Sequence, residues 1–208
     1  SILSEYDGRL TFKADKFRWR GYQIKDLDVG LNLQDSGLAF TQLSGVLFGG
    51  DLELSGSLAS AGIPALSLEI DFEEGSLAQA LRATGDLRAA TGLFSFLGGV
   101  TAKGDNQFAM ISSLAGAATF SAGDGIVRGL DLPKFSSQLL SLEEFEDYVQ
   151  LTVSTLREGE SRFTSVQAST AIKDGVVIIS DGRAVFGGGE ATAKATFNLP
   201  EWTMDARV

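Results

Sequence analysis

The segment Leu66-Ser67-Leu68-Glu69-Ile70-Asp71-Phe72 alternates strictly between apolar and polar residues. A period of two residues is that of a β-strand with one dry face and one wet face. The same alternation occurs in four other segments, at 10–14, 27–34, 52–58 and 191–199. Half-buried strands of this kind are typical of antiparallel sheets. The sequence therefore predicts a mainly β fold with a few helices.

Turn signals separate many of these segments. Asp-Gly or Ser-Gly pairs occur at 7–8, 36–37, 124–125, 174–175 and 181–182. Glycine adopts the positive φ of a tight turn without steric cost, so such pairs are hairpin signals. We therefore expect consecutive strands to pair as an antiparallel meander.

Helical patterns are confined to the middle of the chain. Ser76 and Gln79 have the spacing of a capping box, which predicts a helix over 76–82 that ends near Gly85. Asp105 is the expected N-cap of a second helix, over 105–114. Further helices are predicted over 132–140 and 141–157. Their apolar faces predict that they cover part of the sheet.

A distant repeat relates residues 36–54 to residues 174–193 at an offset of 138. Both copies read as a turn, an apolar strand, a polar turn, a short strand, Phe-Gly-Gly and an alternating strand. Repeated units stack and share a continuous sheet. Chance similarity between glycine-rich meanders is the alternative.

The helix and strand patterns divide the chain into three parts. A first β module is predicted at 1–74 and a connecting segment with a short helix at 75–104. The second module is predicted at 105–208, with helices in 105–157 and a β meander in 159–208. Both ends of the chain look cut, and we expect it to be a piece of a longer protein with its anchor or targeting segment elsewhere.

The composition excludes several classes of protein. The net charge is −10, which argues against nucleic-acid binding and against electrostatic docking on anionic membranes. The chain contains neither cysteine nor histidine. Disulfides, Ser-His-Asp triads and zinc sites with Cys or His ligands are therefore excluded.

Enzyme chemistry has little support in the sequence. Glu73-Glu74 and Glu143-Glu144 could supply the two carboxyl groups of a glycoside hydrolase, but charged residues at a strand end or a helix start explain them better. The glycine runs at 98–99 and 187–189 lack the Lys and Ser/Thr of a P-loop, and more simply permit a bend or bulge. We expect no enzyme activity, no cofactor and no metal site.

The alternating strands raise the question of what covers their apolar face. Apolar surface left in water costs roughly 25 cal/mol per Å². No predicted helix lies within 9–72, so this face must contact lipid, a partner or other parts of the chain. The candidate lipid-contacting residues are Leu27, Val29, Leu31, Leu33, Leu52, Leu54, Leu66, Leu68, Ile70 and Phe72. The alternative, that these side chains form an ordinary packed core, stays open.

Three structural motifs give the chain a family resemblance. Ser113-Leu-Ala-Gly-Ala-Ala-Thr-Phe120 is followed by Asp124-Gly-Ile-Val-Arg-Gly-Leu-Asp-Leu132, and Phe-Gly-Gly occurs at Phe48 and Phe186. Ile172-Lys-Asp-Gly175 precedes a strand. Together these segments resemble the C-terminal region of the AsmA-like family. The resemblance extends from about residue 5 to the end and is densest over 90–200.

The resemblance implies a location and a function. Members of the family are similar to bridge-like lipid-transfer proteins of the Gram-negative envelope, anchored in the inner membrane and projecting into the periplasm. It implies repeated sheets curved into an apolar groove, phospholipid acyl chains as ligands and a role in outer-membrane biogenesis. This chain lacks the anchor and is far shorter than a full member. A scaffolding domain that binds protein partners in outer-membrane protein assembly is the alternative function.

Overall fold

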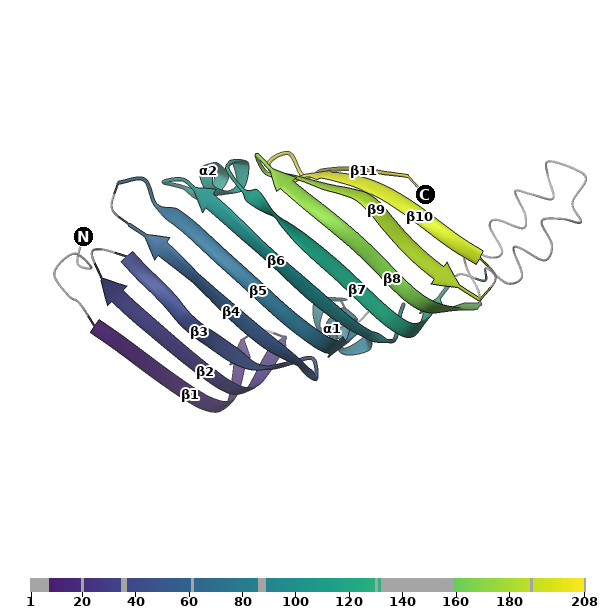
Figure 1. The fold of residues 1–208 in the computed structure, drawn as a ribbon, viewed down its shortest axis with the longest axis horizontal. Helices are drawn as coiled ribbons and strands as arrows, with labels where there is room; N and C mark the ends of the chain where they lie inside the picture. Colours follow the sequence, from purple (N-terminus) through teal and green to yellow (C-terminus); the bar gives the residue numbers. More distant parts are fainter. Residues whose placement is uncertain are drawn as a thin grey trace, which may run out of the picture.

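The protein is a single sheet of eleven antiparallel strands in sequence order (Figure 1). The computed structural model describes residues 8–19, 21–34, 37–60, 62–85, 89–129, 131, 159–187 and 189–207. Its elements are β1 (Gly8–Trp19), β2 (Tyr22–Gln34), β3 (Gly37–Leu47), β4 (Gly50–Ala59), β5 (Ala65–Ser76), α1 (Leu77–Gly85), β6 (Leu93–Lys103), α2 (Gln107–Ser112), β7 (Ala115–Arg128), β8 (Glu160–Lys173), β9 (Val176–Phe186), β10 (Gly189–Asn198) and β11 (Thr203–Arg207). The predicted mainly β fold and antiparallel meander are confirmed.

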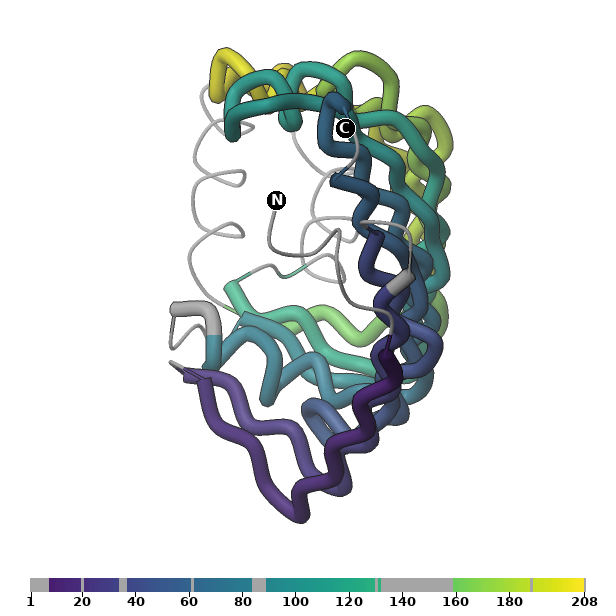
Figure 2. Tube along the Cα trace, turned by 90° about the vertical axis from the view of Figure 1, so that its left-hand side faces the viewer, coloured from purple at the N-terminus to yellow at the C-terminus, as the bar shows by residue number. Residues whose placement is uncertain are grey.

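The sheet is open, because β1 and β11 are its two edges and do not pair with each other. Consecutive connections alternate between the two ends of the strands. One end, the α1 rim, carries the β1–β2, β3–β4 and β9–β10 connections and α1. The other end, the α2 rim, carries the β4–β5, β8–β9 and β10–β11 connections and α2. Viewed along its long axis, the sheet is strongly curved (Figure 2).

The turn predictions are confirmed only in part. Asp174 and Gly175 form the β8–β9 turn, with φ of 51° and 72°. The Asp124-Gly125 prediction is wrong: this pair lies inside β7, where Asp124 has a φ of 42° within a continuous strand. Asp181-Gly182 lies inside β9, so that prediction is wrong too. The Asp181 carboxylate accepts a hydrogen bond from the Ser169 amide at 2.9 Å, which holds an irregularity in the ladder rather than a chain reversal.

The other two turn signals lie partly outside the described residues. Gly8 begins β1 and Gly37 begins β3, but Asp7 and Ser36 are not described.

The helix over 76–82 is confirmed as α1, and it ends at Gly85 as predicted. The Ser76 hydroxyl accepts a hydrogen bond from the Gln79 amide at 3.4 Å, as expected of the capping box. The second helix is shorter than predicted. Its N-cap is Asn106 and not Asp105, since the Asn106 side chain accepts from the Ala109 amide at 2.9 Å. The predicted helices over 132–140 and 141–157 lie outside the described residues.

Two strands occupy segments for which the sequence predicted something else. β6 lies in the segment 75–104, expected to be a connection, and β7 lies in 105–157, expected to be helical. Glycine and alanine at Gly98, Gly116 and Ala118 interrupt the alternation of large apolar residues and so hide the strand pattern. The division into modules at 1–74 and 105–208 stays a prediction, and the hydrogen-bonded sheet continues across both boundaries.

The two copies of the repeat form equivalent hairpins, β3–β4 and β9–β10. Phe48-Gly49 and Phe186-Gly187 lie at the turns of these hairpins on the α1 rim. The pairing register shifts between Phe40 and Leu43 in β3, and between Ile179 and Gly182 in β9. With the offset of 138 these shifts fall within one residue of each other, so the two copies share an irregularity as well as a sequence pattern.

Candidate functional site: the apolar face of the sheet

The ten candidate residues all lie in β2, β4 and β5. The register places Leu33 in line with Leu58 and Leu66, and Leu31 in line with Leu68. The strands thus bring these side chains to one face, which we call the apolar face, because residues in register across a sheet point the same way. The remaining candidates on this face are Leu27, Val29, Leu52, Leu54, Ile70 and Phe72.

One row of residues crosses this face through all eleven strands without a polar side chain. We call it the central row, and consecutive members are direct cross-strand partners. It consists of Leu10, Leu31, Phe40, Gly56, Leu68, Val100, Gly116, Ile172, Val177, Phe197 and Met204. At about 4.8 Å between strands, the row is about 50 Å long.

Most of this row beyond β5 shows no clear strand pattern in the sequence. Val100 follows the Gly98-Gly99 pair, and Ile172 and Val177 lie on either side of a turn, so none of them stands in a long alternating run. The alternation of Phe94, Phe96 and Val100 with Ser95, Leu97 and Thr101 was the available signal.

Buried hydrophobic side chains gather towards the rims and not in the middle of the apolar face. Leu27, Leu52, Phe72, Ala122 and Phe163 are buried on the α1-rim side, and Ala102 is buried beside α2. Phe163, only 1% exposed, is the most buried of them. Towards this rim the Phe94 ring also packs between Phe72, tilted at a centroid distance of 5.0 Å, and Phe120, stacked at 5.9 Å.

In the middle of the apolar face, between the side chains buried near the α1 rim and near the α2 rim, the apolar side chains are only half-buried. Leu54, Leu68, Ile70 and Val100 are all in this intermediate class. At the outer strands, Leu10 and Phe12 of β1 and Met204 of β11 are exposed. Three of the ten candidates, Leu27, Leu52 and Phe72, therefore belong to a packed core. The other seven lie in the half-buried part of the face: Val29, Leu31, Leu33, Leu54, Leu66, Leu68 and Ile70.

Neighbouring glycines show which face of the sheet is concave. A Cβ atom on Gly98, which lies on the apolar face opposite Ala118, would be 2.6 Å from the Ala118 Cβ and 2.9 Å from the Ala117 carbonyl oxygen. A Cβ atom on Gly99, which points to the other face, would have its nearest neighbours at 3.6 and 3.7 Å. Side chains crowd on the inside of a bend, so the apolar face is the concave face. The predicted role of Gly98-Gly99 in a bend fits this geometry.

The opposite, polar face carries a cluster of five carboxylates on β4 and β5. Asp51 is directly opposite Glu73, and Glu53 is directly opposite Asp71, with Glu69 next to them. Among the described residues, none of these five carboxylates forms an ion pair. Like charges directly opposite one another destabilise a sheet, so this face has to stay in contact with water or with cations.

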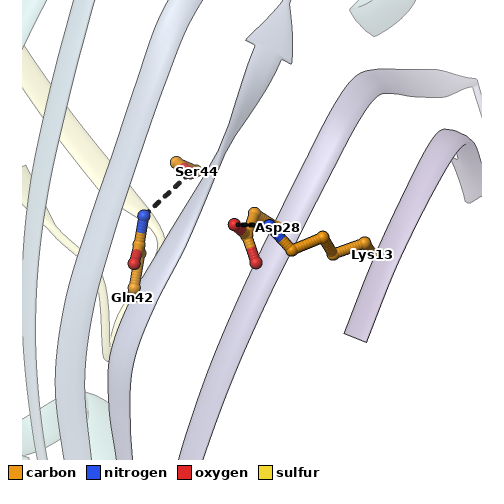
Figure 3. A network of polar contacts seen from close by, with 4 residues as sticks. All are labelled: Lys13, Asp28, Gln42 and Ser44. Carbon is orange, nitrogen blue, oxygen red and sulfur yellow. Dashed lines mark hydrogen bonds and ion pairs between the residues drawn. The ribbon is translucent and has the colours of Figure 1, made fainter. Parts of the chain in front are cut away.

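Nearer the β1 edge, polar side chains on the polar face form hydrogen bonds and ion pairs with one another. Lys13 donates to the Asp28 carboxylate at 2.8 Å, and the Gln42 amide donates to the Ser44 hydroxyl at 3.4 Å (Figure 3). At the far side of the sheet, the hydrogen bond and charge of Glu190 raise the pKa of Arg183. These pairs are largely exposed, so each contributes little to stability.

A hollow of about 720 Å³ lies on the polar face, over the middle of β3 to β8. It is lined by short side chains such as Ser55 and Thr119, with Glu53, Glu69 and Asp71 among them. No group of three or more carboxylates within the described ranges is arranged to hold a metal ion. Of the carboxylate pairs considered for hydrolysis, Glu73 and Glu74 are exposed on β5, and Glu143-Glu144 lies outside the described residues.

In the part of the chain that the structure describes, no helix has the length and apolar character needed to cross a bilayer.

Comparison with known proteins agrees with this architecture. The AsmA family matches residues 1–181. Protein AsmA of Escherichia coli (strain K12) is 23% identical over 214 residues, covering 99% of this chain but 33% of the relative. The chain thus spans about a third of the length of that relative, and no solved structure matches it. A family match over most of the chain, together with the motifs at Phe48, Ser113 and Asp174, shows that this chain belongs to the AsmA family.

Proposed function

We propose that the chain is a non-enzymatic lipid-handling module whose concave apolar face holds the acyl chains of phospholipids. The observation that carries this proposal is the central row, which stays apolar through eleven strands while its middle is only half-buried. A domain normally covers the apolar face of a sheet with a second layer. Among the described residues, the buried hydrophobic side chains are found towards the rims, and the half-buried strip between them offers apolar side chains to a ligand.

The chemistry of the central strip suits hydrocarbon. Each methylene group that leaves water contributes about 0.8 kcal/mol, and an acyl chain has no polar group that needs a partner. The side chains of Leu54, Leu68 and Val100 likewise have no polar group. We therefore expect low selectivity between acyl chains, with the head groups at the edges of the face where water and charged side chains are present.

Membership of the AsmA family supports a place in the cell envelope. We propose that the chain is a periplasmic part of an inner-membrane protein, whose anchor is a separate segment of the full-length polypeptide. Its contribution would be to phospholipid movement in outer-membrane biogenesis.

Photo-crosslinking tests the proposed ligand site directly. A photoreactive amino acid at Leu68 should crosslink phospholipid, whereas the same probe at Ser67 should not, because Ser67 is the adjacent residue on the polar face. Gently purified protein should also release phospholipid into organic solvent. Absence of lipid from the extract together with equal labelling at both positions would refute the proposal.

The free edges of the sheet support a second candidate function. β1 and β11 each pair with only one described strand, so both have backbone groups available for another strand. A scaffolding domain would use such an edge to bind a protein partner in outer-membrane protein assembly. In that case, pull-downs from envelope extract should give a stoichiometric partner, and the purified protein should contain no lipid.

A further inference from the structure

Four connections on the α2 rim are joined by backbone hydrogen bonds into one ledge, which we call the α2 ledge. The Gly104 amide donates to the Pro64 carbonyl at 3.0 Å, which links the β4–β5 connection to the start of α2. The Gly175 amide donates to the Leu114 carbonyl at 2.9 Å, and the Leu199 amide donates to the Gly175 carbonyl at 3.0 Å. The ledge is therefore a pre-organised part of the sheet and not a set of independent loops.

Three large apolar side chains project from the α2 ledge into solvent. They are Ile63 before β5, Phe108 in α2 and Trp202 in the β10–β11 turn, which are 69%, 66% and 84% exposed. Phe108 and Trp202 line one shallow hollow of about 420 Å³ with Leu199 and Pro200. Exposed large apolar residues from three separate connections on one rim indicate an interaction surface.

The backbone of Trp202 gives a second and independent indication. Its φ is 55°, in the left-handed region that glycine adopts without cost but a bulky residue avoids. Phe48 also has a positive φ, of 53°, but its ring packs against Tyr22 at 6.1 Å. Trp202 has no such packing to offset the strain, since its side chain is almost fully exposed. A strained residue presented to solvent points to a functional requirement at that position.

We propose that the α2 ledge docks on the interface of a phospholipid bilayer, with Ile63, Phe108 and Trp202 inserted among the lipid head groups. Tryptophan prefers this interface because its ring is apolar and its N–H is polar. The inference rests on the proposed function, because Leu58, Leu66 and Ala102 form an apolar row from β4 to β6 between the ledge and the central row. Lipid that enters at the ledge would therefore meet the half-buried Leu58 and Leu66 before it reaches the central row.

The charges of the ledge favour docking on a zwitterionic bilayer over docking on an anionic one. Its exposed charged residues are Lys103, Lys173, Asp105, Asp174 and Glu201, so basic and acidic groups nearly balance. Docking is thus driven by the apolar side chains, not by attraction to anionic lipid. It should change little with salt and should weaken when anionic lipid is added, because the whole chain has a net charge of −10.

Flotation with vesicles of phosphatidylcholine tests the docking proposal. The protein should float with the vesicles, and Trp202→Ser or Phe108→Ser should lower its partition by about tenfold, since each removes one aromatic ring that docking would transfer from water to the bilayer. Leu97→Ser is the matched control, because Leu97 is also an exposed apolar residue but lies on the polar face. No flotation of the unmodified protein, or an equal loss with Leu97→Ser, would overturn the proposal.

Fluorescence gives a site-specific readout. The chain has two tryptophans, so Trp19→Phe leaves Trp202 as the single tryptophan, which can be excited selectively beside the three tyrosines. Its emission should shift to shorter wavelength with vesicles and be quenched by brominated phosphatidylcholine, and an unchanged spectrum would overturn the proposal. The lipid extract of the same protein separates the two hypotheses. Phospholipid in the extract without docking refutes only the ledge, whereas docking without bound phospholipid refutes the lipid-handling function.

Discussion

Adding one methyl group to Gly98 and, in a separate variant, to Gly99 tests which face of the sheet is concave. The two residues are adjacent in β6, and neither has a positive φ, so alanine fits the backbone at both positions. They differ in the space beside them. The new Cβ atom would lie 2.6 Å from the Ala118 Cβ in Gly98→Ala, but 3.6 Å from its nearest neighbour in Gly99→Ala.

The expected effects on stability have opposite signs. Two carbon atoms have their optimal separation at about 3.5–4.0 Å, so the Gly98→Ala contact forces the β6 and β7 backbones apart. Overpacking of this kind costs about 1–3 kcal/mol, while the lower entropy of the unfolded chain returns about 0.4–1 kcal/mol. Gly99→Ala has only the second, favourable effect. At about 2–4 °C per kcal/mol, Gly98→Ala should lower the melting temperature by several degrees, and Gly99→Ala should leave it unchanged or raise it slightly.

Thermal unfolding followed by circular dichroism measures both variants, and the crosslinking yield at Leu68 reports on the curvature. If flattening the bend widens the apolar face, Gly98→Ala should also change that yield, whereas Gly99→Ala should not. Equal destabilisation by the two substitutions, or greater destabilisation by Gly99→Ala, would show that the apolar face is not the inside of the bend.

Four further substitutions, one of them a control, test other parts of the structure. Glu53→Gln should raise the free energy of unfolding by about 0.2–1 kcal/mol at low salt, because it removes the repulsion from Asp71 directly opposite. Glu69→Gln is the control and should have a smaller effect, because the residue opposite Glu69 on β4 is the uncharged Ser55. Urea titration measures both, and a gain from Glu69→Gln as large as that from Glu53→Gln would contradict the pairwise explanation. Phe163→Ala should lower the free energy of unfolding by about 3–5 kcal/mol in the same urea titration, because the side chain is fully buried. A decrease under about 1 kcal/mol would show that the α1-rim core does not stabilise the fold. Trp202→Gly should leave the melting temperature unchanged or higher, because glycine relieves a strain of about 1–2 kcal/mol, and a clear decrease would mean that the ring packs against the protein.

Strict alternation was sufficient to predict the strands that build one half of the sheet. The runs at 27–34, 52–58 and 66–72 correspond to β2, β4 and β5, and the candidate residues within them share a face as expected. Period-two alternation fixes the face of each side chain once the strand is identified, so no knowledge of the partner strand is needed.

β6 and β7 escaped prediction because of the curvature. Inside the bend there is no room for a Cβ atom at Gly98, so this position of β6 cannot hold the large apolar residue that would reveal the strand. Asp124 and Asp181 look like hairpin residues for a related reason, since irregularities in a strand use the same residue types as turns. The α2 ledge depends on contacts between residues such as Pro64 and Gly104, and between Gly175 and Leu199. These residues are far apart in the sequence, so no pattern of neighbouring residues could predict their contacts.

The distribution of buried side chains implies that ligand binding and folding use different residues. Phe163, Phe72 and Leu52 are buried towards one rim, and the backbone ladder holds the eleven strands together. Leu54 and Leu68, in the half-buried strip, contribute less to stability, so Leu54→Ala should cost roughly 1–2 kcal/mol against about 3–5 for Phe163→Ala. A ligand that covers the strip would recover part of that missing burial and raise the melting temperature of the loaded protein, in proportion to its affinity. An apolar surface of this kind can change its hydrocarbon contacts while the fold stays intact, as a module that passes lipid onward requires.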